Sequence, residues 1–169
     1  MTQPDAPATP PPAGRVTSAP ATNAAVIRPV APPDRDAWRR LFAAYGEFYE
    51  TAFDESVLDG VWAWLLDAEH PVTALVAELD AQVVGFAHLR RQHDTFTAGP
   101  GWFLDDLYVL PAQRGAGVAR ALIEGCAATA QAGGGGTLRW ITASDNHTAQ
   151  RLYDRLATRT SWVTYGRET

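Results

Sequence analysis

A strand, a glycine turn and a helix follow one another in the second half of the chain, and they restrict the possible folds more than any other segment. Residues 102–109 are apolar and aromatic enough for a buried strand, and residues 115–132 have the apolar spacing of a helix. Gly115 and Gly117 stand at the turn, where glycines let the backbone approach a ligand closely. The first turn of the helix offers unpaired N–H groups, and Arg114 adds a charged donor beside them. A turn of this kind is suited to binding phosphate oxygens.

Two common nucleotide-binding turns do not fit this sequence. A P-loop requires Gly-Lys-Ser or Gly-Lys-Thr at the start of the helix, and the chain contains no lysine. The dinucleotide fingerprint requires an acidic residue about 20 positions after its glycines, and the corresponding residue after Gly117 is Thr137. The alternative is that Gly115 and Gly117 only form a tight turn and bind no ligand, and the two glycines alone do not distinguish these interpretations.

The remaining pattern predicts strands and helices that share one sheet. Asp80-Ala81-Gln82 is a tight polar turn between two strands, and His93–Pro100 is expected to be a polar loop. The predicted order is β-α-α-β-β-β-α-β-α-β, an α/β fold with a mixed central sheet and helices on both faces. The predicted strands are 25–30, 72–79, 83–90, 102–109, 138–142 and 162–165, and the predicted helices are 38–49, 57–65, 115–132 and 145–156.

The prolines indicate where the folded part begins. Nine of the 12 prolines lie in the first 33 residues, and residues 1–23 carry almost no side chain large enough to bury. Such a segment cannot offset the entropy lost on ordering. We therefore expect a disordered Pro/Ala-rich tail over 1–23 and a single domain over 24–169, with Pro10-Pro11-Pro12 as a polyproline ligand in the alternative interpretation.

Charge and cysteine content narrow the classes of partner. The formal net charge of −5 argues against a nucleic-acid binder and favours neutral or cationic partners. No apolar run approaches the roughly 18 residues of a membrane span. Cys126 is the single cysteine, which suits the reducing cytoplasm and excludes an internal disulfide. We expect Cys126 in the core and no metal site, because His88 and His93 lack a third ligand at metal spacing.

Two linked motifs then point to a family. Arg114-x-x-Gly117-x-Ala119 follows a Leu-Tyr-Val strand, and Asn146-x-x-Ala149-x-x-Leu152-Tyr153 follows after a helix and a strand. Together they resemble the GCN5-related N-acetyltransferase (GNAT) superfamily. The resemblance implies that the first motif holds the pyrophosphate of acetyl-coenzyme A, while the Asn and Tyr of the second lie beside the pantetheine arm and sulfur. The implied cosubstrate-binding residues are Leu107, Tyr108, Val109, Arg114, Gly115, Ala116, Gly117, Val118, Ala119, Asn146 and Tyr153.

Within the superfamily, the strand Phe103-Leu-Asp-Asp-Leu-Tyr-Val109 is similar to that of the diamine (spermidine/spermine) acetyltransferase branch. Asp105 stands where that branch usually has Glu, and the Gly-Phe that often follows the catalytic Tyr is missing. The implied reaction transfers an acetyl group to a primary amine of a small molecule, such as a polyamine or amino acid, by direct attack in a ternary complex. The alternatives are an acyl-coenzyme A sensor without turnover and a protein N-terminal or lysine acetyltransferase.

The reaction requires a base, an oxyanion donor and an acid. An alkylammonium must lose a proton before it attacks, and Asp105 is the first candidate base, directly or through a water. Adjacent strand residues point to opposite faces, so we expect only one of Asp105 and Asp106 to face the cleft. The resemblance places the backbone N–H of Val109 at the oxyanion. It also makes Tyr153 the acid for the leaving thiolate, the alternative being an aromatic residue on a buried helix face.

The candidate substrate pocket lies on the first helix. Tyr45, Tyr49 and Glu50, with Asp106, are the predicted substrate-binding residues, since aromatic faces and carboxylates attract alkylammonium groups. Phe42 and Phe48 are expected to belong to the core-facing stripe of the same helix. Homodimers are common among relatives, and Trp64 or Trp162 is available for such a contact.

Overall fold

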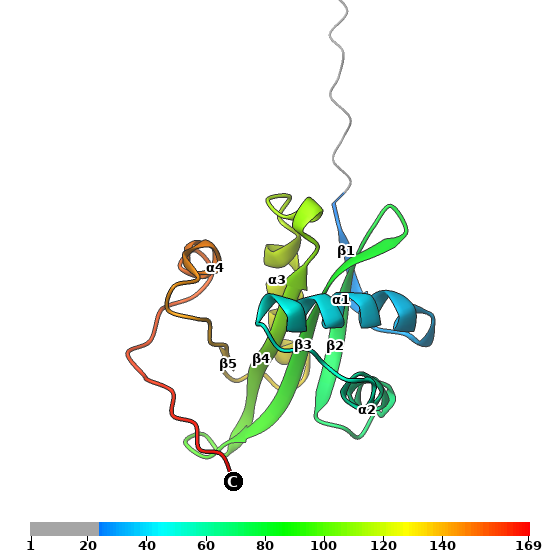
Figure 1. Ribbon diagram of the computed structural model, residues 1–169. Coiled ribbons are helices and arrows are strands. Elements are labelled where there is room, and N and C mark those ends of the chain that lie inside the picture. The colour runs from blue at the N-terminus through cyan, green and yellow to red at the C-terminus, as the bar shows by residue number, and fades with distance from the viewer. Residues whose placement is uncertain (1–23) are drawn as a thin grey trace, which may run out of the picture.

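The computed structural model describes residues 24–169, and the tail predicted for 1–23 lies outside the described residues. A mixed five-stranded sheet with the order β1-β2-β3-β4-β5 forms the centre of the described part (Figure 1). The strands are β1 (Val26–Pro29), β2 (Val72–Leu79), β3 (Gln82–Asp94), β4 (Gly99–Val109) and β5 (Leu138–Arg139). The helices are α1 (Arg35–Phe48), α2 (Glu55–Leu66), α3 (Val118–Ala132) and α4 (His147–Tyr153), with 3-10 turns η1 (Pro32–Asp34) and η2 (Pro111–Gln113).

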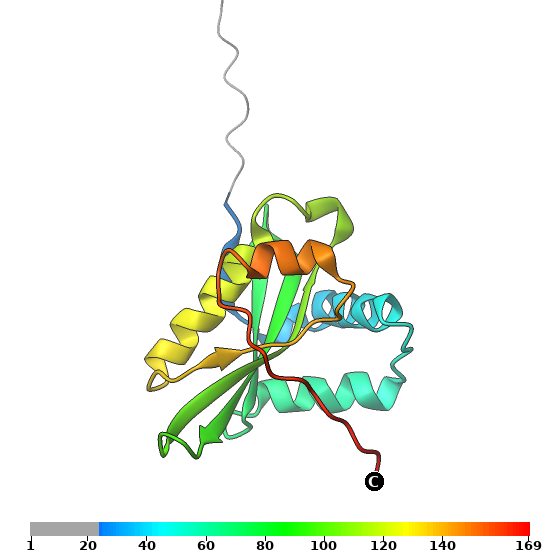
Figure 2. The same ribbon diagram turned by 90° about the vertical axis from the view of Figure 1, so that its left-hand side faces the viewer.

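Strands β1 to β4 pair antiparallel, and β5 runs parallel to β4 after the crossover through α3. Helices α1 and α2 cover one face of the sheet, and α3 covers the other (Figures 1 and 2). The predicted α/β fold class, a mixed sheet with helices on both faces, is therefore confirmed. None of the helices within residues 24–169 has both the length and the apolar character needed to cross a bilayer.

Aromatic side chains form the core beneath α1 and α2. Trp38 and Phe42 of α1 and Trp62 of α2 are buried against Phe86 of β3. The Trp38 and Phe42 rings stack with centroids 5.2 Å apart, and Phe86 meets Phe42 edge-on at 5.8 Å. Rings in these geometries add attraction to the apolar area that they bury. This layer fixes α1 over β3 and β4, where the predicted substrate residues lie.

Aliphatic side chains dominate the core beneath α3. Leu122, Ile123 and Cys126 of α3 are buried against Leu89 of β3 and Leu104 of β4. The predicted core position of Cys126 is confirmed, and burial raises the pKa of its thiol to about 12. The helix begins at Val118, three residues after the predicted start, because Gly115 and Gly117 both take the left-handed conformation.

The connection between β3 and β4 is shorter than the sequence predicts. Most of the expected loop His93–Pro100 belongs to the strands, since β3 continues to Asp94 and β4 begins at Gly99. Residues 92–94 pair with 99–101 beyond the positions where β2 and β5 pair, so the two strands extend past the rest of the sheet as a ribbon. Backbone pairing satisfies N–H and C=O groups that a polar loop would leave to water.

The predicted final strand is wrong. The segment Trp162–Tyr165 takes no regular structure, and Trp162, Val163 and Tyr165 are 87%, 71% and 90% exposed. Its β-prone sequence has no adjacent partner, because β5 is only two residues long and the chain then leaves the sheet (Figure 2). A strand needs a neighbour to satisfy its backbone groups, and the C-terminal segment of this structure has none.

Candidate active site

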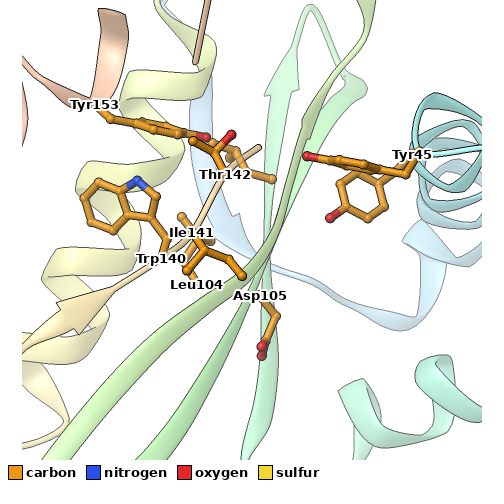
Figure 3. Close-up of a pocket in the computed structure, with 9 residues that line it drawn as sticks. Tyr45, Leu104, Asp105, Trp140, Ile141, Thr142 and Tyr153 are labelled. Carbon is orange, nitrogen blue, oxygen red and sulfur yellow. The ribbon is translucent and has the colours of Figure 1, made fainter. Parts of the chain in front are cut away.

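A cavity lies where β4, β5 and the helices α1 and α4 converge (Figure 3). Tyr45 extends into it from α1 and Tyr153 extends from α4 on the opposite side (Figure 3). The lining contains a carboxylate and no basic residue, so the cavity suits a neutral or cationic ligand. Its residues are Tyr45, Tyr49, Leu104, Asp105, Leu107, Trp140, Ile141, Thr142 and Tyr153.

The cavity exists because β5 leaves β4 early. The two strands pair only where Trp102 is opposite Leu138 and Phe103 is opposite Arg139. From Trp140 onward the chain diverges toward α4, so the carboxyl-terminal half of β4 pairs with no strand on that side within residues 24–169. Open α/β sheets bind ligands in such places, where neighbouring strands separate.

The backbone of Val109 is directed toward this opening. Leu110 N–H donates to the carbonyl of Val84 on β3 at 2.9 Å, and the neighbouring pair is Gly85 with Val109. Hydrogen-bonded and non-bonded pairs alternate along an antiparallel ladder, so Val109 points its N–H and C=O away from β3. The predicted oxyanion donor therefore lies on the side from which β5 has departed.

The glycine turn leads from β4 into α3, and no other side chain covers its two glycines. Gly115 and Gly117 have φ angles of 82° and 84°, and no atom lies within 4 Å of a Cβ built on either one. Val118 is the first residue of α3, so the N–H groups of the first turn lack partners within the helix. An accessible backbone with a positive helix end fits a phosphate group, as the predicted cosubstrate requires.

Arg114 bridges the end of β4 and the end of α1. Its Nε donates to the carbonyl of Val109 at 3.1 Å, and the guanidinium lies 5.7 Å from the Tyr108 ring centroid and 5.9 Å from that of Phe48. Phe48 is 54% exposed, so its predicted core position is wrong. As the last residue of α1, it packs against the Arg114 guanidinium and leaves the core to Phe42.

A β-bulge in β4 determines where the two acidic residues point. The register between β3 and β4 shifts beside His88, and no residue of β3 is paired with Asp105 in the backbone ladder. Asp106 contacts His88, while Asp105 contacts Arg90, which lies two positions further along β3 on the same face. The two aspartates do not face opposite sides as alternation predicts, because the extra residue interrupts the alternation, although only Asp105 lines the cavity, as expected. Both carboxylates lie on the face that α1 covers.

The carboxylate of Asp105 is held by an arginine. Arg90 donates from Nε at 2.9 Å and from Nη2 at 2.7 Å, one bond to each oxygen of Asp105. This pairing raises the pKa of the Arg90 guanidinium. Although Asp105 lines the cavity, its carboxylate points away from Tyr45 and Tyr153 (Figure 3). Asp105 reaches an amine beside the tyrosines only through a water in this orientation.

Asp106 has different partners, which the sequence interpretation missed. The Nδ1 of His88 lies 2.8 Å from one oxygen of Asp106, and the Nε2 of the same ring accepts a hydrogen bond from the indole of Trp38 at 2.9 Å. Tyr45 also donates to Asp106, and burial together with this carboxylate raises the pKa of Tyr45. One signal was available: strand alternation puts His88 on the buried face of Phe86, where a polar ring requires partners.

The predicted acid and its neighbour both lie on α4. Tyr153 packs edge-on against Trp140 with ring centroids 5.5 Å apart, and burial and nearby Tyr49 raise its pKa to about 12. It therefore holds its proton at neutral pH. Asn146 is the N-cap of the helix, and its side chain accepts from the N–H of Ala149 at 3.2 Å. The capping role considered for Asn146 is thus observed.

The predicted substrate residues separate into two groups. Tyr45 and Tyr49 line the cavity, with rings 5.0 Å apart. Glu50 and Asp106 do not line the cavity: Glu50 is exposed after the end of α1, with a φ angle of 56°, and Asp106 lies behind Tyr45. The structure adds Trp140, Ile141 and Thr142 to the candidate site, because the chain after β5 turns along the opening.

Comparisons with known proteins agree with this geometry. The model of the acetyltransferase (GNAT) family matches residues 36–157. D-amino-acid N-acetyltransferase HPA3 of Saccharomyces cerevisiae is 30% identical over 145 residues, which cover 84% of this chain and 89% of that protein. Aminoglycoside N(6')-acetyltransferase type 1 of Stenotrophomonas maltophilia is 34% identical over 104 residues, or 60% of this chain and 64% of that one.

A solved structure shows the same fold. Aminoglycoside N-acetyltransferase AAC(6')-Iy, in complex with CoA, superimposes with a TM-score of 0.76 at 22% identity, covering 89% of this chain and 99% of that chain. The superfamily predicted from the two motifs is confirmed. The chain belongs to the acetyltransferase (GNAT) family and is an acetyl-coenzyme A-dependent N-acetyltransferase.

Proposed function

We propose that the protein acetylates a primary amine of a small molecule whose remainder is uncharged or cationic. The observation that carries this proposal is the cavity itself, which combines the carboxylate of Asp105, the protonated hydroxyl of Tyr153 and aromatic walls, without a basic lining residue. Aromatic faces and carboxylates attract ammonium groups. A substrate carboxylate would find no cation among these lining residues, so polyamines and aminoglycosides fit better than free amino acids.

The cosubstrate binds along the open side of β4. We assign its phosphates to Arg114 and the backbone of residues 115–119, and its pantetheine arm to the backbone of residues 107–109 and to Asn146. The open backbone at Gly115 and Gly117 and the separated strand end support this assignment. Acetyl-coenzyme A supplies the acetyl group as a thioester.

The reacting amine lies between the two tyrosine-bearing helices. Asp105 takes the ammonium proton through a water, and Asp106 attracts the ammonium. The Val109 N–H donates to the acetyl oxygen as negative charge develops there. Tyr153 holds the proton that the leaving sulfur needs, since its pKa of about 12 keeps the hydroxyl protonated.

Relatives act on different amines, so the identity of the acceptor amine has to be determined by experiment. One relative is a D-amino-acid acetyltransferase and another modifies aminoglycosides, while the strand motif of this chain is similar to the diamine branch. We place the enzyme in the cytoplasm, because its single cysteine is a buried thiol.

Thiol release from acetyl-coenzyme A tests the proposal. The panel contains spermidine, an aminoglycoside, a D-amino acid and a lysine-containing peptide, each with the wild type and Tyr153→Phe. We expect turnover with spermidine or the aminoglycoside, lowered about 10²-fold by Tyr153→Phe. Tyr165→Phe is the matched control, since Tyr165 is 90% exposed and should keep wild-type turnover.

Other outcomes would overturn the proposal. Turnover with the peptide alone would indicate a protein acetyltransferase. Cosubstrate binding without turnover on any amine would indicate an acyl-coenzyme A sensor. Turnover restricted to the D-amino acid would contradict the argument from the uncharged and acidic cavity lining.

A further inference from the structure

A buried indole and imidazole pair lies behind the substrate side of the cavity. Trp38 and His88 are 1% and 2% exposed, and the indole N–H of Trp38 donates to Nε2 of His88 at 2.9 Å. An indole nitrogen only donates, so Nε2 of His88 carries no proton. The proton of the neutral ring is then on Nδ1, which donates to Asp106 at 2.8 Å. Trp38 thereby selects the tautomer that holds Asp106.

Aromatic rings surround the imidazole of His88. The rings of Phe42 and Phe86 lie 5.0 Å and 4.6 Å from the imidazole, measured between centroids. The titratable groups that face this region are Tyr45 from α1 and Asp106 from β4, with the Arg90–Asp105 ion pair two residues along β3.

The two aspartates differ in the charge of their partners. Arg90 balances the charge of Asp105, whereas the partners of Asp106 within residues 24–169 are His88 and Tyr45, both neutral hydrogen-bond donors. The Asp106 side chain is 23% exposed, and it does not itself line the cavity, but its neighbour Tyr45 does. Asp106 is therefore held beside the cavity without being fully buried. A fixed carboxylate without a balancing cation attracts an ammonium group.

We propose that His88 is a positioning residue, which orients Asp106 to receive the ammonium of the acceptor amine, and that Trp38 fixes the tautomer of His88. This inference rests on the proposed amine acetylation and adds two residues that touch neither substrate. A positioning role explains why a polar ring occupies the aromatic core. Both ring nitrogens of His88 keep hydrogen-bond partners when the ring is buried.

Three variants separate positioning from structural support. His88→Leu removes the donor to Asp106, and we expect KM for the amine to rise about ten-fold, as expected for a lost charge-assisted hydrogen bond. His88→Asn keeps an N–H near the position of Nδ1, and we expect it to restore KM to within about three-fold. KM for acetyl-coenzyme A should change less than about two-fold in both variants, since the glycine turn is unaffected.

Trp38→Phe keeps an aromatic ring but frees Nε2 of His88. The ring is then free to take either tautomer, and the tautomer with its proton on Nε2 cannot donate from Nδ1 to Asp106. A part of the molecules then lacks the donor to Asp106, so we expect Trp38→Phe to raise KM for the amine by less than His88→Leu does, with KM for acetyl-coenzyme A unchanged. Asp106→Asn should raise KM like His88→Leu, and the double variant should show no further rise.

Calorimetry with coenzyme A bound measures the affinity for the amine in the absence of turnover. It therefore tests the positioning role of His88 independently of the proposed function. If the wild type binds amine without turnover, the proposed function fails, and the same variant pattern in Kd would still support positioning. Equal changes in both KM values, a similar effect of His88→Asn and His88→Leu, or a wild type that binds no amine would overturn the inference. Unfolding free energies of all variants show which of them remain folded.

Discussion

Arg90 of β3 and Asp105 of β4 form a bidentate ion pair, with donor–acceptor distances of 2.9 and 2.7 Å. The pair forms because the bulge in β4 turns Asp105 to the face of Arg90. It gives the predicted base a fixed orientation and a balanced charge. The nearby Asp106 lacks such a cation among the described residues, so the two carboxylates have different tasks in the proposed reaction.

Asp105→Asn tests the base. Losing a general base lowers a rate by about 10² to 10⁴, so we expect kcat at neutral pH to fall by at least 10²-fold. The unfolding free energy should change by less than about 1 kcal/mol, since the ion pair is partly exposed. Glu124→Gln breaks an exposed ion pair on α3 and should leave kcat unchanged. An unchanged kcat in Asp105→Asn would exclude Asp105 as the base.

Two glycines with positive φ should respond differently to alanine. At Gly115 the added Cβ meets nothing within 4 Å, so the cost is the left-handed backbone alone, about 1 to 2 kcal/mol. We expect Gly115→Ala to raise KM for acetyl-coenzyme A while the protein stays folded. At Gly136 the added Cβ lies 2.0 Å from the carbonyl oxygen of Pro100, so Gly136→Ala should destabilise much more. Equal losses of stability, measured by denaturant unfolding, would contradict this contrast.

The raised pKa of Tyr153 predicts the alkaline behaviour of activity. Because its pKa is about 12 and its ordinary value is 10.0, the acid should remain protonated through pH 10. We expect the pH profile of kcat to show no loss from tyrosine ionisation between pH 8 and about 10.5. Ultraviolet titration of wild type and Tyr153→Phe should differ by one tyrosine that ionises above this range. A kcat decline centred at pH 10 that Tyr153→Phe abolishes would refute the assignment.

Cys126 and Tyr153 also predict how stability depends on pH. Burial raises the pKa of Cys126 from 9.0 and that of Tyr153 from 10.0, each to about 12. A group with a raised folded pKa stabilises the protein fully below its unfolded pKa, and this stabilisation is lost as pH rises through the folded pKa. We expect the unfolding free energy to start falling near pH 9 and to fall through pH 12.

Cys126→Ala isolates the thiol in this experiment. Its unfolding free energy should lose the pH dependence between 9 and 10 while keeping the decline above 10 that the tyrosine contributes. In the folded wild type, the buried thiol should react slowly with a thiol reagent at pH 8. Rapid modification of the native protein would show that Cys126 is accessible.

Local pattern was sufficient for much of the fold. Helical spacing placed Phe42 and Cys126 in the core, and the structure confirms both. Family motifs led from Arg114, Gly117 and Tyr153 to an acetyltransferase because their spacing spans a strand, a turn and two helices. These are properties of neighbouring residues, which a sequence records directly.

Tertiary structure decided the features that depend on distant partners. Regular alternation cannot reveal the bulge at Asp105, which forms only when β3 and β4 pair. The segment Trp162–Tyr165 has the composition of a strand, but β5 offers it no adjacent edge. The contact of Trp38 with His88 joins residues 50 positions apart. Sequence determined which elements form and which family they belong to, whereas packing decided which polar groups meet, because hydrogen bonds between distant residues depend on how the elements assemble.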